Sequence, residues 1–328
     1  MRRARILGGV GAGYHCLSRV VGGEFLLGNV EKEKFRVLMR QVEGFSGVRI
    51  LTYAILSNHF HLLLEVPECR DLGDEALLRR LEYLYSARYV SEVRGQLEGY
   101  RAEGREDLAE ALRVRYLVRM SDISEFMKTL KQRFTQWYNG SRERKGTLWE
   151  ERFKSVLVEF KPEALRTIAA YIDLNAVRAG LVDDPKDYRF CGYGAAVGGS
   201  RRSRQGLGRV LEERPGQWGQ TSRGYRQLLY GRAGRSKKRA GISPEEVRVM
   251  IETGGELSRE ELLRCRVRYL TEGLVLGSRG FVEEVLGRQR ERLGLRRPGR
   301  ARPMKYADWG GLCTLRNLKR QPVHPGIN

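Results

Sequence analysis

The sequence predicts an α+β fold in which a ferredoxin-like antiparallel sheet carries helices on one face. Two observations lead to this expectation. In the first 198 residues, strand-like and helix-like segments alternate in the order β-α-β-β-α-β once a helical insertion is set aside. In addition, Ser57 and Asn58 separate two strongly β-prone runs, as a tight hairpin turn does. This places an antiparallel pair at the centre of that order.

The strands are marked by runs of β-branched, aromatic and aliphatic residues, and the helices by apolar residues that recur on one side. Ser121 and Asp122 supply capping side chains for the second helix, and Pro162 suits the first turn of the last one. In chain order, the expected elements are a strand at residues 14–20, a helix at 29–43, strands at 48–56 and 59–66, a helix at 121–138, a strand at 152–160 and a helix from residue 162.

The rest of the chain divides by composition. We expect residues 1–198 to form one domain, with residues 70–120, rich in Leu, Glu and Arg, as an inserted helical pair. Residues 199–241 place arginines and lysines among Gly, Ser and Gln, which predicts a basic, partly flexible connection. Residues 242–328 predict a helical module. Its helices are expected at residues 244–252, 260–272 and 281–293.

Charge is the most distinctive feature of the composition. The chain has 61 Lys and Arg residues against 40 Asp and Glu residues, a formal net charge of +21. Such an excess attracts polyanions, and nucleic acid is the usual partner; a basic surface without a specific partner is the alternative. The helical module at residues 242–328 is accordingly either a second DNA-binding unit or a helical cap on the core.

The sequence carries no pattern of membrane insertion or secretion. No stretch approaches the roughly 20 apolar residues that a membrane span needs. The basic N-terminus is followed by a short glycine-rich run, which does not resemble a signal peptide. We therefore expect a cytoplasmic, nucleoid-associated protein with no membrane partner.

Two of the four histidines form a His-x-His pair, His59 and His61, on an expected strand. Because side chains alternate along a strand, both imidazoles point to the face opposite Phe60. The apolar set with Phe60 packs under the helices, and the histidines emerge together on the open face, where they are suitably placed to bind one divalent ion. A His-x-His pair on a strand is also common as a purely structural feature.

A second cluster lies on the helix that begins near Pro162. Tyr171 and Asn175 are four residues apart on that helix, and Arg178 follows about one turn later. A hydroxyl, an amide oxygen and a cation are therefore presented on one surface. His15, in the first strand, is read as a structural residue.

These motifs resemble blocks of a known family, the single-tyrosine HUH transposases. The most similar branch is that of the REP-associated tyrosine transposases, relatives of the insertion-sequence-200-like enzymes. The resemblance covers roughly residues 10–195. It is carried by a first-strand block at residues 14–19, a His-hydrophobic-His block at 57–64, a block entering the fourth strand at 146–154 and a nucleophile-helix block at 171–180.

The resemblance implies a role for each matching position. It makes His59 and His61 metal ligands, Tyr171 the nucleophile and Asn175 the third ligand, where the insertion-sequence branch has glutamine. Mg²⁺ or Mn²⁺ is the implied ion, and two histidines with oxygen ligands are compatible with it, although imidazole also accepts zinc. A phenol with a pKa near 10 is a poor nucleophile at neutral pH, so such an ion has a function in polarising the phosphate.

The implied function is a metal-dependent transposase that cleaves and rejoins single-stranded DNA, at hairpin or palindromic repeat ends, through a 5′-phosphotyrosine. A homodimer is compatible with the family. Two alternatives stay open: a non-catalytic nucleic-acid-binding protein on the same scaffold, and a metal nuclease that activates water and leaves Tyr171 without a role. The side chains expected to contact nucleic acid are Trp149, Arg152, Arg178, Arg201, Arg202, Lys237 and Lys238.

Overall fold

The computed structural model of the 328-residue chain describes residues 6, 8, 11–68, 72–231, 258–289, 300–315 and 323–324. The chain forms two compact units. The first consists of Met1–Phe25, Ile50–Glu65 and Trp149–Asn328, and the second of Leu26–Arg49 and Val66–Leu148. No helix within the described ranges is long and apolar enough to cross a membrane.

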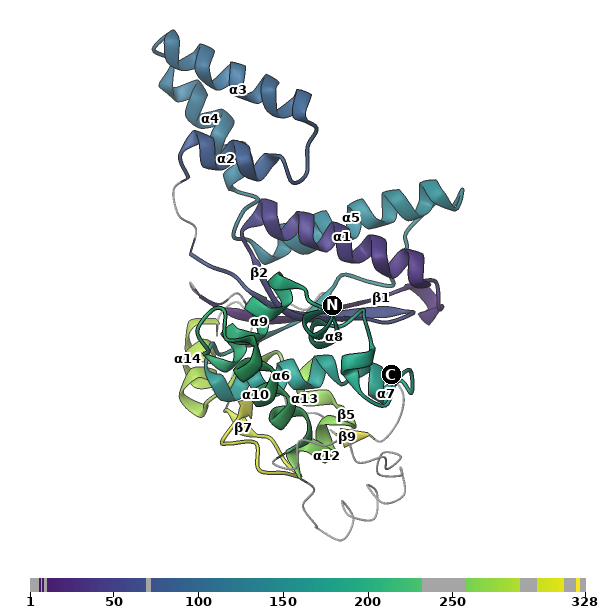
Figure 1. Ribbon diagram of the computed structural model, residues 1–328. Coiled ribbons are helices and arrows are strands. Elements are labelled where there is room, and N and C mark those ends of the chain that lie inside the picture. The colour runs from purple at the N-terminus through teal and green to yellow at the C-terminus, as the bar shows by residue number, and fades with distance from the viewer. Residues whose placement is uncertain are drawn as a thin grey trace. The chain divides into compact units, whose positions relative to one another are not determined.

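The first unit is built on a mixed sheet with the strand order β2-β3-β1-β4-β6-β8-β7. Strands β1 and β2 of this sheet are labelled in Figure 1. Strand β1 is antiparallel to both β3 and β4. The first four strands in the order β2-β3-β1-β4 reproduce the ferredoxin-like arrangement, so the predicted α+β fold class is confirmed. The strands of this part are β1 (Gly13–Arg19), β2 (Arg49–Ile55), β3 (His59–Glu65) and β4 (Lys154–Val158).

The C-terminal region adds strands to this sheet, whereas the sequence predicts only helices there. β6 pairs in parallel with β4, and β8 continues the sheet beyond it. This pairing covers the edge of β4, which would otherwise expose unpaired backbone groups. The added strands are β6 (Val275–Gly277), β7 (Arg302–Pro303) and β8 (Cys313–Thr314), and a separate ladder joins β5 (Arg266–Val267) to β9 (Val323–His324).

Of the three helices expected in this region, the first, at residues 244–252, lies outside the described residues. The second, at residues 260–272, is broken by β5 into α12 (Arg259–Leu263) and α13 (Arg268–Glu272). The third is present as α14 (Arg279–Gln289). Helix propensity at residues 260–272 is therefore overridden by strand pairing at Arg266–Val267.

Residues 199–231, expected as part of a connection, are mostly helical. α9 (Arg201–Leu211) packs closely on β2, because the hydrogen of Gly206 faces the backbone there: a Cβ at this residue would lie 2.3 Å from the carbonyl oxygen of Leu51. The other helical elements of the first unit are η1 (Val21–Gly23), α6 (Pro162–Asp173), α7 (Asn175–Arg178), η2 (Pro185–Asp187), α8 (Gly192–Val197) and α10 (Trp218–Tyr230).

The second unit contains the two helices of the ferredoxin-like order. α1 (Asn29–Ser46) and α5 (Ile123–Ser141) pack on each other, with the rings of Phe35 and Phe134 edge to face at 5.1 Å. As its sequence predicts, α5 begins at a capping residue. The carboxylate of Asp122 accepts hydrogen bonds from the backbone amides of Ser124 and Glu125, at 2.7 and 2.8 Å.

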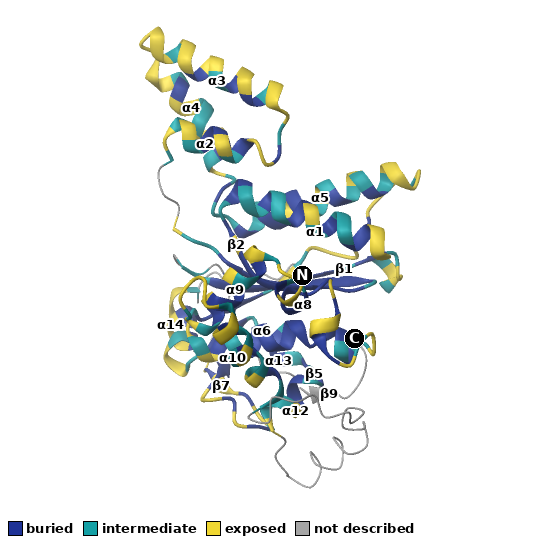
Figure 2. Ribbon diagram, viewed as in Figure 1, coloured by how far each residue is buried: buried dark blue, intermediate teal, exposed yellow. Residues whose placement is uncertain are grey.

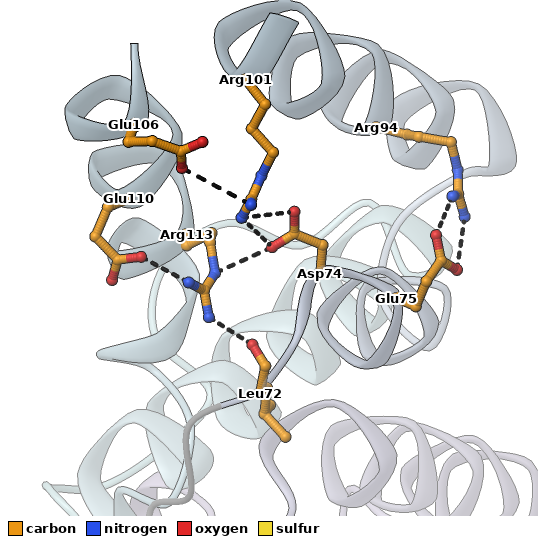
Figure 3. Close-up of polar contacts among 8 residues, drawn as sticks. All are labelled: Leu72, Asp74, Glu75, Arg94, Arg101, Glu106, Glu110 and Arg113. Atoms are coloured by element: carbon orange, nitrogen blue, oxygen red, sulfur yellow. Dashed lines mark hydrogen bonds and ion pairs between the residues drawn. The ribbon is translucent and has the colours of Figure 1, made fainter. Parts of the chain in front are cut away.

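The insertion at residues 70–120 forms three helices where the sequence predicts a pair: α2 (Asp74–Leu81), α3 (Ala87–Ala102) and α4 (Glu106–Leu117). Asp74, in the first turn of α2, joins all three elements. It pairs with Arg101 from α3 at 3.0 Å and with Arg113 from α4 at 3.2 Å (Figure 3). Much of the outer surface of α3 and α4 is exposed (Figure 2).

Candidate active site

Three histidines lie on one face of the central sheet. In the register of β1 with β3, Leu17 lies opposite His61. Directly opposed residues share a face, and alternate residues of a strand return to it, so His15 and His59 lie on the same face as His61. The alternation within His59–Phe60–His61 is visible in the sequence. The approach of His15 depends on the pairing of two distant strands and is not.

Tyr171 meets these histidines from α6. Its ring centroid lies 6.2 Å from that of His15 and 6.2 Å from that of His61, and both contacts are edge-on. The rings of His59 and His61 are 5.1 Å apart and nearly perpendicular. α6 is buried along most of its length, because Ala, Leu and Ile occupy nearly every turn. The helix therefore delivers the phenol directly onto the histidine face.

The hydrogen bonds around His15 fix which nitrogen of His61 is free. Nδ1 of His15 lies 2.7 Å from the carbonyl oxygen of Leu270, which can only accept, so Nδ1 carries the proton. Burial lowers the pKa of His15 to about 4, so the ring is neutral and its Nε2 is an acceptor. Nδ1 of His61, at 2.8 Å, must then donate to that Nε2. This leaves the lone pair of His61 on its own Nε2.

His59 has the same tautomer, with the proton on Nδ1, and Asn58 is the residue that sets it. Its Nδ1 lies 2.6 Å from Oδ1 of Asn58, whose amide nitrogen donates to the carbonyl of Gly23 at 3.1 Å. The amide is thus oriented with its oxygen toward the imidazole, so Nδ1 of His59 donates and Nε2 keeps its lone pair. Burial lowers the pKa of His59 to about 3 and that of His61 well below its usual value, and nearby arginines add to both shifts. Both rings are neutral at pH 7.

Arg178 and Asn175 surround the tyrosine from its own chain segment. The guanidinium of Arg178 stacks on the Tyr171 ring, 3.9 Å from its centroid, and donates to the carbonyls of Tyr171 and Leu263 at 2.6 and 2.5 Å. The amide nitrogen of Asn175 donates to the carbonyls of Tyr171 and Ile172 at 3.3 and 3.1 Å. Asn175 thereby caps the end of α6 through two backbone carbonyls.

Polar atoms without partners are concentrated here. Within the described residues, the Tyr171 hydroxyl, the Nε2 atoms of His59 and His61 and Nε of Arg178 are buried and make no hydrogen bond. A buried polar atom without a partner is costly, so native proteins keep few of them. Their concentration in one cluster of the fold indicates a site built for a ligand.

The face that carries the histidines is covered, so the expectation of an open face is wrong. Tyr171 is fully buried, and His59 and His61 are 2% and 3% exposed. α13 packs on β1 and β4, and the carbonyls of Leu263 and Leu270 reach the site from the α12–α13 segment. The pairing of β6 with β4 draws this segment onto the sheet.

A buried acid, Asp173, holds α6 in place. Its carboxylate accepts hydrogen bonds from the hydroxyls of Thr52 and Tyr225, at 2.8 and 2.5 Å, and from the backbone amide of Tyr193 at 2.9 Å. Burial raises the pKa of Asp173 to about 6, although these donors oppose the shift. No role is predicted for Asp173 from the sequence, and an acid within an otherwise apolar helix is the one signal there that points to it.

The donor set fits a divalent ion. His59 and His61 each offer a neutral, unpartnered Nε2, the form of imidazole that binds metals. Each of their other nitrogens is held by a partner, as is typical of ligating histidines. Within the described ranges, no three His, Cys, Asp or Glu side chains converge as a ligand group, because His15 is turned toward His61. A further ligand from the described residues would therefore be an oxygen of an amide or a hydroxyl, and water or phosphate could supply others.

The remaining residues expected to bind nucleic acid are dispersed. Trp149 is 6% exposed and packs edge-on against Phe60 at 5.4 Å, on the face of β3 opposite the histidines. It is therefore a core side chain here, not a surface on which a base stacks. Arg152 is exposed, as are Arg201 and Arg202 at the start of α9. The two lysines Lys237 and Lys238 lie outside the described residues.

No model of a protein family matches the chain, and no curated protein matches it. A solved structure of a REP-associated tyrosine transposase bound to a REP hairpin is similar to it, with 16% sequence identity and a TM-score of 0.40. The match covers 61% of this chain and 87% of that chain.

Proposed function

We propose that the protein is a metal-dependent DNA-strand transferase that cleaves and rejoins single-stranded DNA with Tyr171 as nucleophile. The observation that carries this proposal is that the Tyr171 ring packs edge-on against the ring of His61, which lies beside that of His59. Among the described residues, the Tyr171 hydroxyl and the Nε2 atoms of both histidines are buried and have no hydrogen-bond partner. A phenol beside two metal-competent imidazoles is a constellation for phosphoryl transfer through a covalent intermediate.

Each residue has a defined part in the proposed reaction. His59 and His61 hold Mg²⁺ or Mn²⁺, with Asn175 as the proposed third ligand. When bound, the ion polarises the scissile phosphate and stabilises its transition-state charge. The phenol oxygen of Tyr171 forms a bond to phosphorus as the bond to the 3′-oxygen breaks, and the proton lost by the phenol is balanced by one taken up at the 3′-oxygen. Rejoining reverses these steps with another 3′-hydroxyl.

The burial of the site adds a requirement. Because Tyr171 is fully buried, DNA reaches it only after the α12–α13 segment moves away from the histidine face. A flexible single strand suits this entry better than a rigid duplex, and the net charge of +21 favours a polyanion. Hairpin-forming repeat ends, which combine a stem with unpaired flanks, are the proposed substrates.

The same burial favours a second candidate, a non-catalytic nucleic-acid-binding protein on this scaffold. A site that stays closed over Tyr171 would leave only the basic surface to act. The two functions differ in one product, because only the transferase links DNA covalently to the chain.

The test is a denaturing gel with labelled single-stranded hairpins and Mn²⁺. Wild type is expected to give a labelled band at protein mass that disappears with chelator and in Tyr171→Phe. The matched control is Tyr188→Phe, which removes another buried phenol hydroxyl, bonded to the carbonyl of Ile55 at 2.7 Å, and should keep the band.

Other products would contradict the proposal. Free 5′-phosphate ends without adduct would indicate a nuclease that activates water. Tight binding without cleavage on a broad pool of hairpins would establish the binding protein. Adducts that survive in Tyr171→Phe would move the nucleophile to another residue.

A further inference from the structure

A cavity of about 790 Å³ lies in the first unit between α9, α10 and the turn that joins them. Its size is within the range of small-molecule sites, and a mononucleotide fits it. The lining includes Phe160, Arg201, Arg204, Arg209, Glu213 and Trp218. Cations, aromatic rings and two carboxylates, the exposed Glu212 and the partly buried Glu213, thus line one cavity.

Two of the arginines are held rigidly against the aromatic rings. Arg204 stacks over Trp218 at 4.9 Å and donates to the carbonyl of Ala196 at 2.9 Å. Arg209 stacks over Phe160 at 5.2 Å and is bonded by two of its nitrogens to the carboxylate of Glu65. These guanidinium groups hold the two aromatic rings in place, so this part of the cavity wall is formed before a ligand binds.

Two further arginines of the lining are free to bind. Arg201 and Arg214 are exposed, and neither forms an ion pair within the part of the chain that the structure describes. Arginine at the rim of a cavity is suited to phosphate, which it binds with two parallel hydrogen bonds. The rim therefore offers positive charge that the fold itself does not use.

The buried part of the cavity carries a negative charge, in contrast to the exposed arginines. Oε2 of Glu213 is buried and has no hydrogen-bond partner within the described residues. A carboxylate can only accept hydrogen bonds, and it repels an anion placed next to it. The ligand must therefore bring N–H donors to Glu213 and negative charge to the arginines, which is the polarity of a nucleotide with its base inward.

The cavity is connected to the candidate active site through β3. Glu65, the partner of Arg209, is on the same face of this strand as His59 and His61, since it lies an even number of residues from both. Glu65 is four residues from His61, about 13 Å at the rise of a strand. A single strand held at Tyr171 can therefore extend a neighbouring nucleotide into the cavity.

We propose that this cavity binds one unpaired nucleotide of the DNA substrate. Its base lies on the free face of Trp218, its N–H edge meets Glu213, and its phosphate meets Arg201 and Arg214. Guanine is the preferred base, because its N1–H and N2–H groups present two adjacent donors to a carboxylate. The inference rests on the proposed function in taking single-stranded DNA as the ligand.

The test measures binding without metal, so that it does not depend on cleavage. The full chain in chelator is titrated by fluorescence anisotropy with a short oligothymidylate and with the same oligomer carrying one central guanosine. Wild type is expected to bind the guanosine oligomer on the order of tenfold more tightly. Glu213→Gln should remove this preference without weakening the binding of oligothymidylate.

Matched variants separate the pocket from general effects. Glu212→Gln changes the exposed carboxylate that also lines the cavity and should keep the preference, because the proposed base contact is with Glu213. Trp218→Phe retains a stacking surface and should keep most of the affinity that Trp218→Ala loses. Circular dichroism of each variant shows whether it is folded.

Equal affinities of wild type for the two oligomers would overturn the inference, as would a guanosine preference that survives in Glu213→Gln. The gel assay for covalent adducts keeps this result distinct from the proposed function. Adducts without a base preference would support the transferase function and contradict nucleotide binding in the cavity. A base preference without adducts would support nucleotide binding in the cavity and indicate a non-catalytic binding protein.

Discussion

The Nε2 atom of His15 lies 2.8 Å from Nδ1 of His61, and the opposite nitrogen of His15 lies 2.7 Å from the carbonyl oxygen of Leu270. The three groups form a relay of hydrogen bonds that ends at a fixed acceptor. It orients the His61 ring and keeps a lone pair on Nε2, where a metal would bind. His15 is thereby a positioning residue for His61.

Loss of this relay should weaken metal binding. Partners of ligating histidines typically contribute about 10- to 100-fold in metal affinity, so His15→Ala is expected to lower Mn²⁺ affinity by that factor. His15→Gln should restore part of it, because an amide oxygen can accept from Nδ1 of His61. Isothermal titration calorimetry measures both. Ser18→Ala, on the opposite face of β1, is the control, and unchanged affinity in His15→Ala would make His15 merely structural.

The contact of α9 with β2 has no room for a side chain at Gly206. A Cβ there would lie 2.3 Å from the carbonyl oxygen of Leu51, so Gly206→Ala should cost about 1–3 kcal/mol of unfolding free energy. Gly208→Ala, two residues along the same helix, meets its nearest atom at 3.8 Å and should stabilise the helix by up to about 1 kcal/mol. Urea denaturation compares them. Equal effects would show that α9 is not seated tightly on β2.

Asp74 is expected to stabilise the helical insertion. It receives both Arg101 and Arg113, and the Arg113 side chain is 11% exposed, so Asp74→Asn should cost about 1 kcal/mol and speed amide exchange in α3 and α4 (Figure 3). Glu75→Gln removes the neighbouring, exposed pair with Arg94 and should leave exchange unchanged. Hydrogen exchange read by mass spectrometry distinguishes the two. A shared loss of protection would contradict a specific role for Asp74.

The sequence predicts the sheet because its signals are local. The hairpin turn at Ser57 and Asn58, the alternation around Phe60 and the capping by Asp122 each act within a few residues, and all are found in the structure. The C-terminal strands are not predicted, because β6 and β8 contain only three and two residues. Such short strands exist only through pairing with partners that are distant in sequence.

The same distinction applies to the candidate site. Tyr171, Asn175 and Arg178 lie within eight residues of one another, which the sequence shows directly. The single helix expected for them is divided in the structure, because α6 ends at Asp173 and the other two residues lie in α7. The part played by His15 needs the β1–β3 register and a carbonyl more than 250 residues away in the chain. The cover over the site depends on that same long-range contact, so the sequence alone predicts an open face.

The pH dependence of stability in chelator tests the buried histidines. Burial lowers the pKa of His15 from 6.5 to about 4 and that of His59 from 6.5 to about 3. Below pH 6.5 the unfolded chain therefore takes up protons that the folded chain excludes. Each histidine should lower the unfolding free energy by about 1.4 kcal/mol per pH unit as pH falls from 6.5 toward 4, and this stability is fully present above pH 6.5.

Asp173 acts in the opposite sense. Its pKa is raised from 3.8 to about 6, so the folded chain binds this proton more tightly than the unfolded chain does. The resulting stabilisation is fully present below pH 3.8 and is lost as pH rises through 6. Between pH 6 and 4, the stability gained by protonation of Asp173 therefore offsets the stability lost through about one histidine. Asp173→Asn should steepen the acid loss of stability, and His15→Gln should make it shallower. Urea denaturation from pH 7.5 to 4.5 measures both slopes, and a slope that neither variant changes would show that these groups are solvated in the folded chain.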